Sequence, residues 1–254
     1  MPTALINQPA GLGDILFTIK IGCHFHQQGV RVIWPISPSY KCLENKIKTN
    51  HIEFYSLDNS FPFKEEFESL SSSDISEVTW YQKKILYIPL TRGFYSKAAK
   101  LINGYEKSNM FGKYAMCGLH PSNWQNYFSL NRDKQKEDKL FSELKIEKPY
   151  HLVNARFGTP PQWEVYLNKV VKTPSDLQRV EIKLKENYNV FDWAKVIEEA
   201  AKIDTVATSM PFIFEVLNLK CNPTIHSRNK TDDEALENFK LMKEIYKKDY
   251  KYEI

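Results

Sequence analysis

The first 36 residues alternate between short apolar runs and one helical pattern. Residues 4–7 form an apolar run that ends before Pro9, and residues 10–14 (AGLGD) make a turn punctuated by glycines. Apolar side chains then recur three or four residues apart from Ile15 to Cys23, and Gly29 ends this helical pattern. Residues 30–36 (VRVIWPI) predict a second strand. A strand, a helix and a strand of these lengths predict a βαβ crossover, and therefore a parallel sheet.

The rest of the first half is less regular. Residues 52–57 and 84–90 predict two further strands, and the Ser- and acid-rich stretch between them, 58–76, is expected to be a surface excursion. Residues 95–118 and 131–145 are expected to be helical. Residues 134–148 are densely charged, which is typical of a solvated helix face that leads into a linker. We therefore place a domain boundary near Pro149.

The second half repeats the alternation of strands and helices. Strands are predicted at residues 150–156, 179–184, 204–208 and 223–226, helices at 192–201 and 212–219, and a terminal amphipathic helix at 235–246. Residues 157–176 form a polar, proline-containing stretch. The fold class is thus α/β with two Rossmann-like parallel-sheet halves, residues 1–148 and 149–254, the second compact. The terminal helix is a candidate for packing back on the first half.

Composition narrows the function only slightly. The chain of 254 residues suits one large domain or two small ones, and 42% hydrophobic with 26% charged residues argues against disorder. The net charge of +4 is too weak to imply nucleic-acid binding. Residues 246–252 interleave lysines with tyrosines, which is the pattern of a single-strand-binding surface. We expect instead that these rings pack on the protein body while the lysines are solvated.

No apolar stretch approaches the ~20 residues that a membrane span needs. The N-terminus also lacks a basic segment followed by an apolar one, so the expected location is cytoplasmic and the four cysteines are expected to be reduced. The six histidines and four cysteines form no metal-binding motif. We expect neither a metal nor a bound cofactor.

The strongest chemical candidate is Asp14, which ends the Gly11-Leu12-Gly13-Asp14 turn. Its place between a first strand and a helix is where doubly wound folds bind phosphates and substrates. A dinucleotide fingerprint would need a glycine at Leu16, and no P-loop is present. Two roles for Asp14 therefore stay open from its chemistry. It is either a helix N-cap or a carboxylate that faces a ligand at the carboxyl edge of the sheet.

The second half offers a complementary anion site. Thr208, Ser209 and Met210 join a strand to a helix, so backbone N–H groups there can face a phosphate, although Ser209 also suits helix capping. Glu215, one turn further, is either a ribose-binding carboxylate or a solvent-facing glutamate.

One arginine ends the first predicted strand of the second half, and another follows the last. Arg156 and Arg228 can each neutralise a diphosphate or form a surface ion pair. In the first half, His120 and Trp124 are candidates for a sugar-stacking surface, with core packing the alternative for Trp124.

These motifs together resemble a known family. The AGLGD turn followed by Ile15 and Leu16 resembles the N-terminus of the heptosyltransferase-like glycosyltransferases, whose GT-B fold has two Rossmann-like halves facing a cleft. Residues 191–209 and the strand at 223–225 resemble their donor-binding half. The resemblance covers residues 3–36 and 186–228. The loop after Thr208 departs from it, since it lacks the family's Asp-Ser-Gly followed by His.

The resemblance implies an inverting transfer of a sugar from a nucleotide-diphosphate sugar to a glycan hydroxyl. Asp14 would be the general base that takes the acceptor's proton. Arg156, Thr208, Ser209 and Glu215 would hold the donor, and Arg156 with the helix start at Ser209 would stabilise the leaving group without a metal. Donor and glycan acceptor are the expected partners, with no nucleic acid.

Two alternatives remain. The first is a non-catalytic nucleotide- or sugar-binding module, which would keep the same site without needing a reactive Asp14. The second is an NAD(P)-dependent oxidoreductase on a Rossmann fold, which Leu16 in place of a glycine disfavours.

Overall fold

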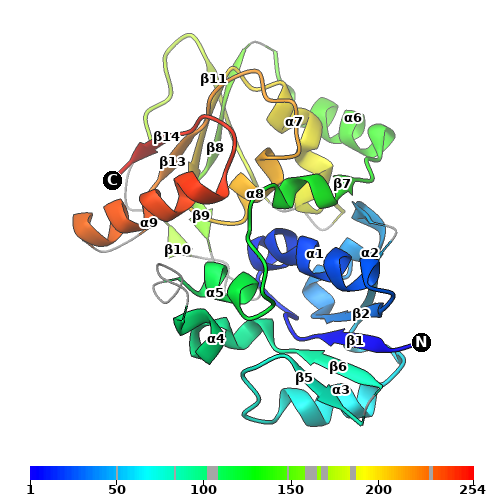
Figure 1. The fold of residues 1–254 in the computed structure, drawn as a ribbon. Helices are drawn as coiled ribbons and strands as arrows, with labels where there is room; N and C mark the ends of the chain where they lie inside the picture. Colours follow the sequence, from blue (N-terminus) through cyan, green and yellow to red (C-terminus); the bar gives the residue numbers. More distant parts are fainter. Residues whose placement is uncertain are drawn as a thin grey trace. The chain divides into compact units, whose positions relative to one another are not determined.

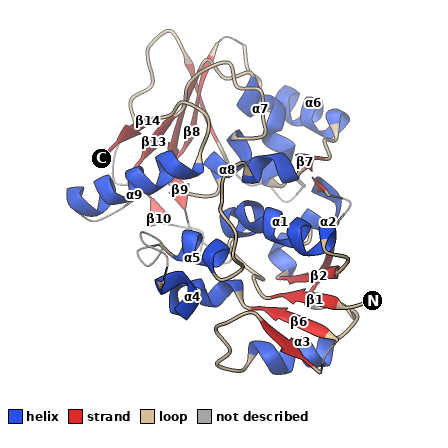
Figure 2. Ribbon diagram, viewed as in Figure 1, coloured by secondary structure: helices blue, strands red, loops and turns tan. Residues whose placement is uncertain are grey.

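The chain forms two compact α/β units, Met1–Ser129 and Leu130–Ile254 (Figure 1). The computed structural model describes residues 1–49, 51–82, 84–101, 108–147, 149–157, 165–166, 171–183, 187–228 and 231–254. The α/β class with two largely parallel sheets is confirmed (Figure 2). The division between the units precedes the boundary expected near Pro149. Helix α6 (Lys134–Glu143) therefore belongs to the second unit rather than to the first.

The first unit is built on a five-stranded sheet. Its strand order is β4 (Glu53–Ser56), β2 (Arg31–Ile36), β1 (Thr3–Ile6), β6 (Ile85–Ile88) and β5 (Thr79–Tyr81). All neighbours are parallel except β5 with β6. Helix α1 (Leu12–Gln27) joins β1 to β2, so the predicted βαβ crossover is confirmed. Because β1 ends at Ile6, the AGLGD turn lies at the carboxyl edge of this sheet.

Helices cover both faces of this sheet. On one face, a Cβ at Gly22 of α1 would lie 3.4 Å from Ile6 Cδ1. On the other, Phe67 and Leu70 of α3 (Lys64–Ser71) join a buried cluster with Leu5 of β1. The stretch 58–76 is thus not only a surface excursion, because the apolar stripe of α3 fills the core beneath a polar outer face.

The other elements of the first unit are short. They are η1 (Pro38–Tyr40), α2 (Leu43–Lys46), β3 (Ile47–Lys48), η2 (Leu90–Tyr95), α4 (Lys97–Lys100), α5 (Asn109–Ala115) and η3 (Trp124–Tyr127), while β7 (Ser129–Leu130) lies where the first unit ends. In the described part of residues 95–118, the expected helix is two short ones, α4 and α5. Helix α5 packs against η2 and also contacts α1. Lys113 of α5 thereby reaches the first turn of α1.

The second unit has its own parallel sheet. The strand order is β11 (Gln178–Glu181), β8 (Tyr150–Asn154), β12 (Lys202–Val206), β13 (Thr224–His226) and β14 (Lys251–Glu253), each parallel to its neighbour. The other elements are α6, η4 (Val190–Trp193), α7 (Ala194–Glu198), α8 (Met210–Phe214), α9 (Asp232–Ile245) and the antiparallel pair β9 (Arg156–Phe157) and β10 (Val165–Tyr166). Four of the five strands were predicted from the sequence, and β14 was not.

The two faces of the second sheet differ in polarity. On one face, Tyr150 of β8 donates a hydrogen bond to the Val196 carbonyl of α7, 2.6 Å away, and Tyr252 of β14 contacts Phe239 of α9. The opposite face carries charged and histidine side chains from four strands. In neither unit does a described helix combine the length and apolar character needed to cross a bilayer.

Candidate functional site

Asp14 lies in the first turn of α1, at the carboxyl edge of the first sheet. The turn depends on Gly11, whose φ of 83° is one that L side chains rarely adopt. A Cβ at Gly11 would also lie 2.6 Å from Asp14 Oδ2. A glycine at this position therefore lets the carboxylate fold back against the backbone of the turn.

Asp14 is not the N-cap of α1. That position belongs to Gly11, and Asp14 is the third residue of the helix. Its negative charge still lies near the N-terminus of α1, where the helix dipole stabilises an anion. The Asp14 side chain is 34% exposed, so part of the carboxylate faces solvent.

Asp14 is paired with a lysine that the sequence did not single out. The Lys113 ammonium, on α5, contacts Asp14 Oδ1 and donates to Gln8 Oε1 at 2.8 Å. The Lys113 side chain is only 1% exposed. Burial lowers the pKa of Lys113, and the negative charge and hydrogen bond of Asp14 oppose part of that shift.

Two further features hold this lysine in place. Gly93 of η2 lets α5 approach closely, since a Cβ there would lie 2.9 Å from both Cγ and the backbone nitrogen of Lys113. Gln8 is buried, and its side-chain amide donates to the Ala10 carbonyl. The backbone carbonyl of Gln8 accepts a hydrogen bond from Trp34 Nε1 at 3.0 Å. The Asp14 site is thus supported by the core of the first unit.

Tyr40 and Asn109 complete the surroundings of the site. Burial raises the pKa of the Tyr40 phenol, and the negative charge of Asp14 raises it further. Hydrogen bonds with the backbone of Gly11 and Leu12 oppose this increase. Asn109 is one helical turn before Lys113, and its Oδ1 is buried without a hydrogen-bond partner in the described part of the chain. The site therefore presents a carboxylate, an ammonium, amides and a phenol around one helix start.

The predicted acceptor residues lie elsewhere in the first unit. Trp124 is completely buried and packs edge-on against Phe17, so it is a core residue and not a sugar-stacking surface. His120 is exposed, its Nδ1 accepts from the Ser122 backbone, and its carbonyl accepts from Lys20.

In the second unit, the predicted donor residues follow neighbouring strands. Thr208 comes after β12 and Arg228 after β13, so parallel pairing puts both at one carboxyl edge of the sheet. Thr208 Oγ1 accepts from the Met210 backbone at 3.3 Å, and Asn154 Nδ2 lies 3.5 Å from the same oxygen. The backbone of Arg156 is in β9, just after β8, and its side chain lies outside what the structure describes.

The helix that follows Thr208 differs from the prediction. Helix α8 spans only five residues, Met210–Phe214, with Ser209 at its N-cap position and no side-chain capping bond from Ser209. Met210 is 3% exposed, so its side chain belongs to the core.

Glu215 is engaged by the chain itself. Its carboxylate accepts from the backbone nitrogens of Lys247 and Lys248, at 2.9 and 3.2 Å, and from the Tyr250 hydroxyl at 2.8 Å. It is 8% exposed, so the predicted ribose contact and the solvent-facing alternative both fail for this side chain. Glu215 anchors the terminal segment, whose Tyr246 and Tyr250 rings are buried as predicted.

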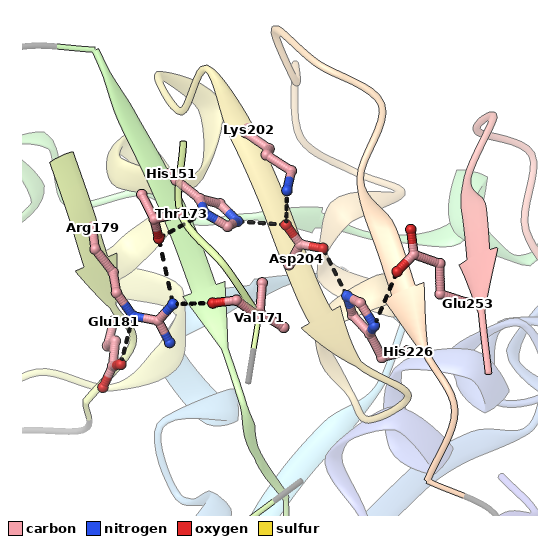
Figure 3. A network of polar contacts seen from close by, with 9 residues as sticks. All are labelled: His151, Val171, Thr173, Arg179, Glu181, Lys202, Asp204, His226 and Glu253. Carbon is pink, nitrogen blue, oxygen red and sulfur yellow. Dashed lines mark hydrogen bonds and ion pairs between the residues drawn. The ribbon is translucent and has the colours of Figure 1, made fainter. Parts of the chain in front are cut away.

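A polar network occupies the face of the second sheet opposite Tyr150 and Tyr252 (Figure 3). Its centre is Asp204 of β12, whose carboxylate contacts Nε2 of His151 on β8, Nε2 of His226 on β13, and Lys202. Burial raises the pKa of Asp204, but the hydrogen bonds from both histidines and Lys202 outweigh it and leave this pKa far below the ordinary value.

A pocket of about 410 Å³ opens beside this network. Its lining residues are Val171, Lys172, Lys202, Asp204, His226, Glu253 and Ile254. The lining includes Lys172 and Lys202 as well as the carboxylates of Asp204 and Glu253, and both carboxylate oxygens of Asp204 have partners. Among the described residues, no cluster of three His, Cys, Asp or Glu side chains is arranged to hold a metal ion.

Comparison with known proteins gives structural matches alone. No protein-family model matches the chain, and no curated protein does. The bacterial iron-containing dodecameric glycosyltransferase TibC from enterotoxigenic E. coli H10407 aligns with 89% of this chain and 57% of its own, at 11% sequence identity and a TM-score of 0.45. The dodecameric iron-containing heptosyltransferase TibC in complex with ADP-D-beta-D-heptose aligns with 89% and 58%, at 11% identity and a TM-score of 0.47.

E. coli heptosyltransferase WaaC with ADP-2-deoxy-2-fluoro heptose aligns with 91% of this chain and 90% of its own, at 12% identity and a TM-score of 0.41. This chain thus spans less than two thirds of the length of the TibC chains. The matched structures are described as glycosyltransferases.

Proposed function

We propose that this chain is an inverting glycosyltransferase that moves a sugar from a nucleotide-diphosphate sugar to a glycan hydroxyl. The observation that carries the proposal is the Asp14 carboxylate, partly exposed at the carboxyl edge of a parallel sheet and fixed there by a buried lysine. A carboxylate so placed can accept a proton from a bound hydroxyl. The AGLGD motif around it supplies the sequence resemblance.

The proposed reaction is a single displacement. The acceptor oxygen attacks the anomeric carbon of the donor while its proton passes to the Asp14 carboxylate. The bond from the anomeric carbon to the diphosphate oxygen breaks, and its electron pair stays with the leaving nucleoside diphosphate. Attack opposite the leaving group inverts the anomeric centre.

The donor is proposed to bind at the carboxyl edge of the second sheet. Thr208, Ser209, Arg156 and Arg228 come after strands that end there, and the arginines are the candidate partners of the diphosphate. The leaving group would then be stabilised by guanidinium groups, without a metal. Met210 and Glu215 are left out of this proposal, because one packs in the core and the other binds the terminal segment.

A second candidate is a nucleotide- or sugar-binding module without catalysis. The observation that favours it is the Asp14–Lys113 pair itself, since a carboxylate neutralised by a buried ammonium could serve packing alone. It would bind the same ligands without transfer.

One series of measurements separates the two. Wild type and Asp14→Asn are screened by thermal shift against UDP-, GDP-, ADP- and CMP-sugars and NAD(P)H. A ligand present at 100 times its Kd should stabilise the fold by ~2.7 kcal/mol. Nucleotide release with a glycan acceptor is then measured, with and without EDTA.

We expect a nucleotide sugar to bind both proteins equally. Transfer should survive EDTA and fall by roughly 10²–10⁴-fold in Asp14→Asn, because an amide cannot take the acceptor's proton. Transfer by Asp14→Asn at the wild-type rate would remove Asp14 from the mechanism. Binding without transfer by wild type would favour the binding module, and binding of NAD(P)H alone would favour an oxidoreductase.

A further inference from the structure

Lys113 combines a positive charge with almost complete burial. Of the lysines whose side chains the structure describes, it alone is buried. We propose that Lys113 is the positioning residue for Asp14: its ammonium fixes the orientation of the carboxylate that takes the acceptor's proton. This inference rests on the proposed function, because it assigns Lys113 a role in the same reaction.

Energetics argue that Lys113 is more than packing. Moving an ammonium out of water costs several kcal/mol, a penalty that an apolar side chain of similar volume does not incur. Methionine at residue 113 could fill the space between α5 and the start of α1 without that penalty. What only the ammonium supplies is a directed contact with Asp14 Oδ1.

The surroundings fix the ammonium in turn. Gln8 Oε1 accepts from it at 2.8 Å, and Gln8 is itself held through Ala10 and Trp34. Gly93 provides the room for α5 to come this close, because a Cβ there would crowd the Lys113 side chain at 2.9 Å. The ammonium therefore has a defined position relative to the first sheet.

The Asp14 carboxylate is confined from two sides as a result. Lys113 holds Oδ1, and Oδ2 lies against the backbone of Gly11, where a Cβ would be 2.6 Å away. Without the lysine, an aspartate that is one-third exposed can occupy other staggered rotamers. A displacement of about 1 Å in a catalytic group can lower a rate by ~10²-fold.

The test uses a variant that keeps the volume and removes the charge. Lys113→Met should fold with a melting temperature lowered by only a few degrees, because Asp14 is one-third exposed and water can replace the lost contact. Its donor affinity and KM should be unchanged while kcat falls at least ~10-fold. Lys64→Met is the matched control, because Lys64 lies in the same unit on α3 and contacts the Leu57 and Asn59 carbonyls instead. It should leave kcat unchanged.

Chemical rescue distinguishes the charge from the cavity. Lys113→Ala should regain transfer when propylamine is added and not when 1-propanol, of similar size and uncharged, is added. Equal rescue by both compounds, or wild-type kcat in Lys113→Met, would overturn the positioning role.

A crystal structure of Lys113→Met tests the position of Asp14 without an activity measurement. If Asp14 leaves its place beside Gly11 in that structure, the positioning role holds even where wild type transfers no sugar, and only the proposed function fails. If Asp14 keeps the same rotamer and the same place, the positioning role is wrong whatever the activity of wild type.

Discussion

Gly11 is the residue on which the shape of the Asp14 turn depends. Its φ of 83° is costly for any side chain, and a Cβ would lie 2.6 Å from Asp14 Oδ2. Gly11→Ala should lower the free energy of unfolding by about 1–3 kcal/mol for the backbone strain, plus a further loss because the carboxylate must move. Urea denaturation measures the sum.

Gly29 provides the matched control for this substitution. Its φ is 79°, and nothing lies within 4 Å of a Cβ built there. Gly29→Ala therefore carries the backbone strain without the contact. Equal losses in the two variants would contradict the close approach of the Asp14 carboxylate to the turn.

Asp204 should make the free energy of unfolding of the second unit depend on pH. Its pKa in the folded chain is lowered by His151, His226 and Lys202 despite burial, so the folded state binds this proton more weakly than the unfolded chain. The stabilisation is present above about pH 4, the unfolded value, and is lost as pH falls below it, by up to ~1.4 kcal/mol per pH unit.

Asp204→Asn removes that titration. Urea unfolding from pH 5 down to pH 3 should show a steeper loss for wild type than for the variant. At pH 7 the variant should be less stable by about 1.5–3 kcal/mol, because the buried His151 and His226 rings lose a charged hydrogen-bond acceptor. Parallel pH profiles would mean that Asp204 does not titrate as its contacts predict.

The sequence singled out Asp14 as a candidate but not Lys113, the residue that pairs with it. Asp14 stands in a local motif, whereas Lys113 is 99 residues away and meets it only through the packing of α5. The available signal was one charged residue, Lys113, inside the otherwise uncharged segment 108–119. Glu215 was singled out for a ligand contact, but its carboxylate binds the terminal segment of the chain. Its position near a helix start could not indicate that long-range contact.

Among the elements, α6 is tied to α7 by one buried ion network. Arg132, just before α6, binds Glu137 of α6 and Glu198 of α7, the latter at 2.6 Å. Glu137 is 1% exposed, and Arg132 binds its carboxylate. Arg132→Ala should lower the free energy of unfolding by about 3–5 kcal/mol, measured by urea denaturation.

Lys195 supplies the comparison on the same pair of helices. Its ion pair with Asp138 is 2.6 Å long but solvent-exposed, with side-chain exposures of 36% and 61%. Lys195→Ala should therefore change stability by no more than ~1 kcal/mol. A loss as large as that of Arg132→Ala would show that burial does not set the strength of these pairs.

Elements with strong local patterns were predicted, and those made by long-range pairing were not. The β1–α1–β2 crossover follows from hydrophobic period and a glycine stop. Strand β14 has only the residues Lys251–Glu253, two of them charged, and it exists because it pairs with β13. Helix α3 was missed because its acidic and serine residues dominate the composition, although Phe67 and Leu70 form a buried stripe.

For the whole molecule, the sequence predicts two α/β units with a boundary near Pro149, whereas the compact units divide after Ser129. The charged segment 134–148 suggested a linker, yet α6 buries Leu140 and Glu137 in the second unit. Charge density describes the outer face of a helix and says nothing of a narrow buried stripe. The cleft between the halves, which the family resemblance implies, stays a prediction.

The position of the boundary can be tested with two fragments. Residues 130–254 should fold alone with one cooperative urea transition, because they form a compact unit with its own sheet and helices. Residues 149–254 lack α6, which leaves Glu198 without Arg132 and exposes the α7 surface that Leu140 and its neighbours cover. This shorter fragment should unfold at much lower urea or aggregate. Two fragments of equal stability would restore the boundary near Pro149 and make α6 a linker, as its charge pattern suggests.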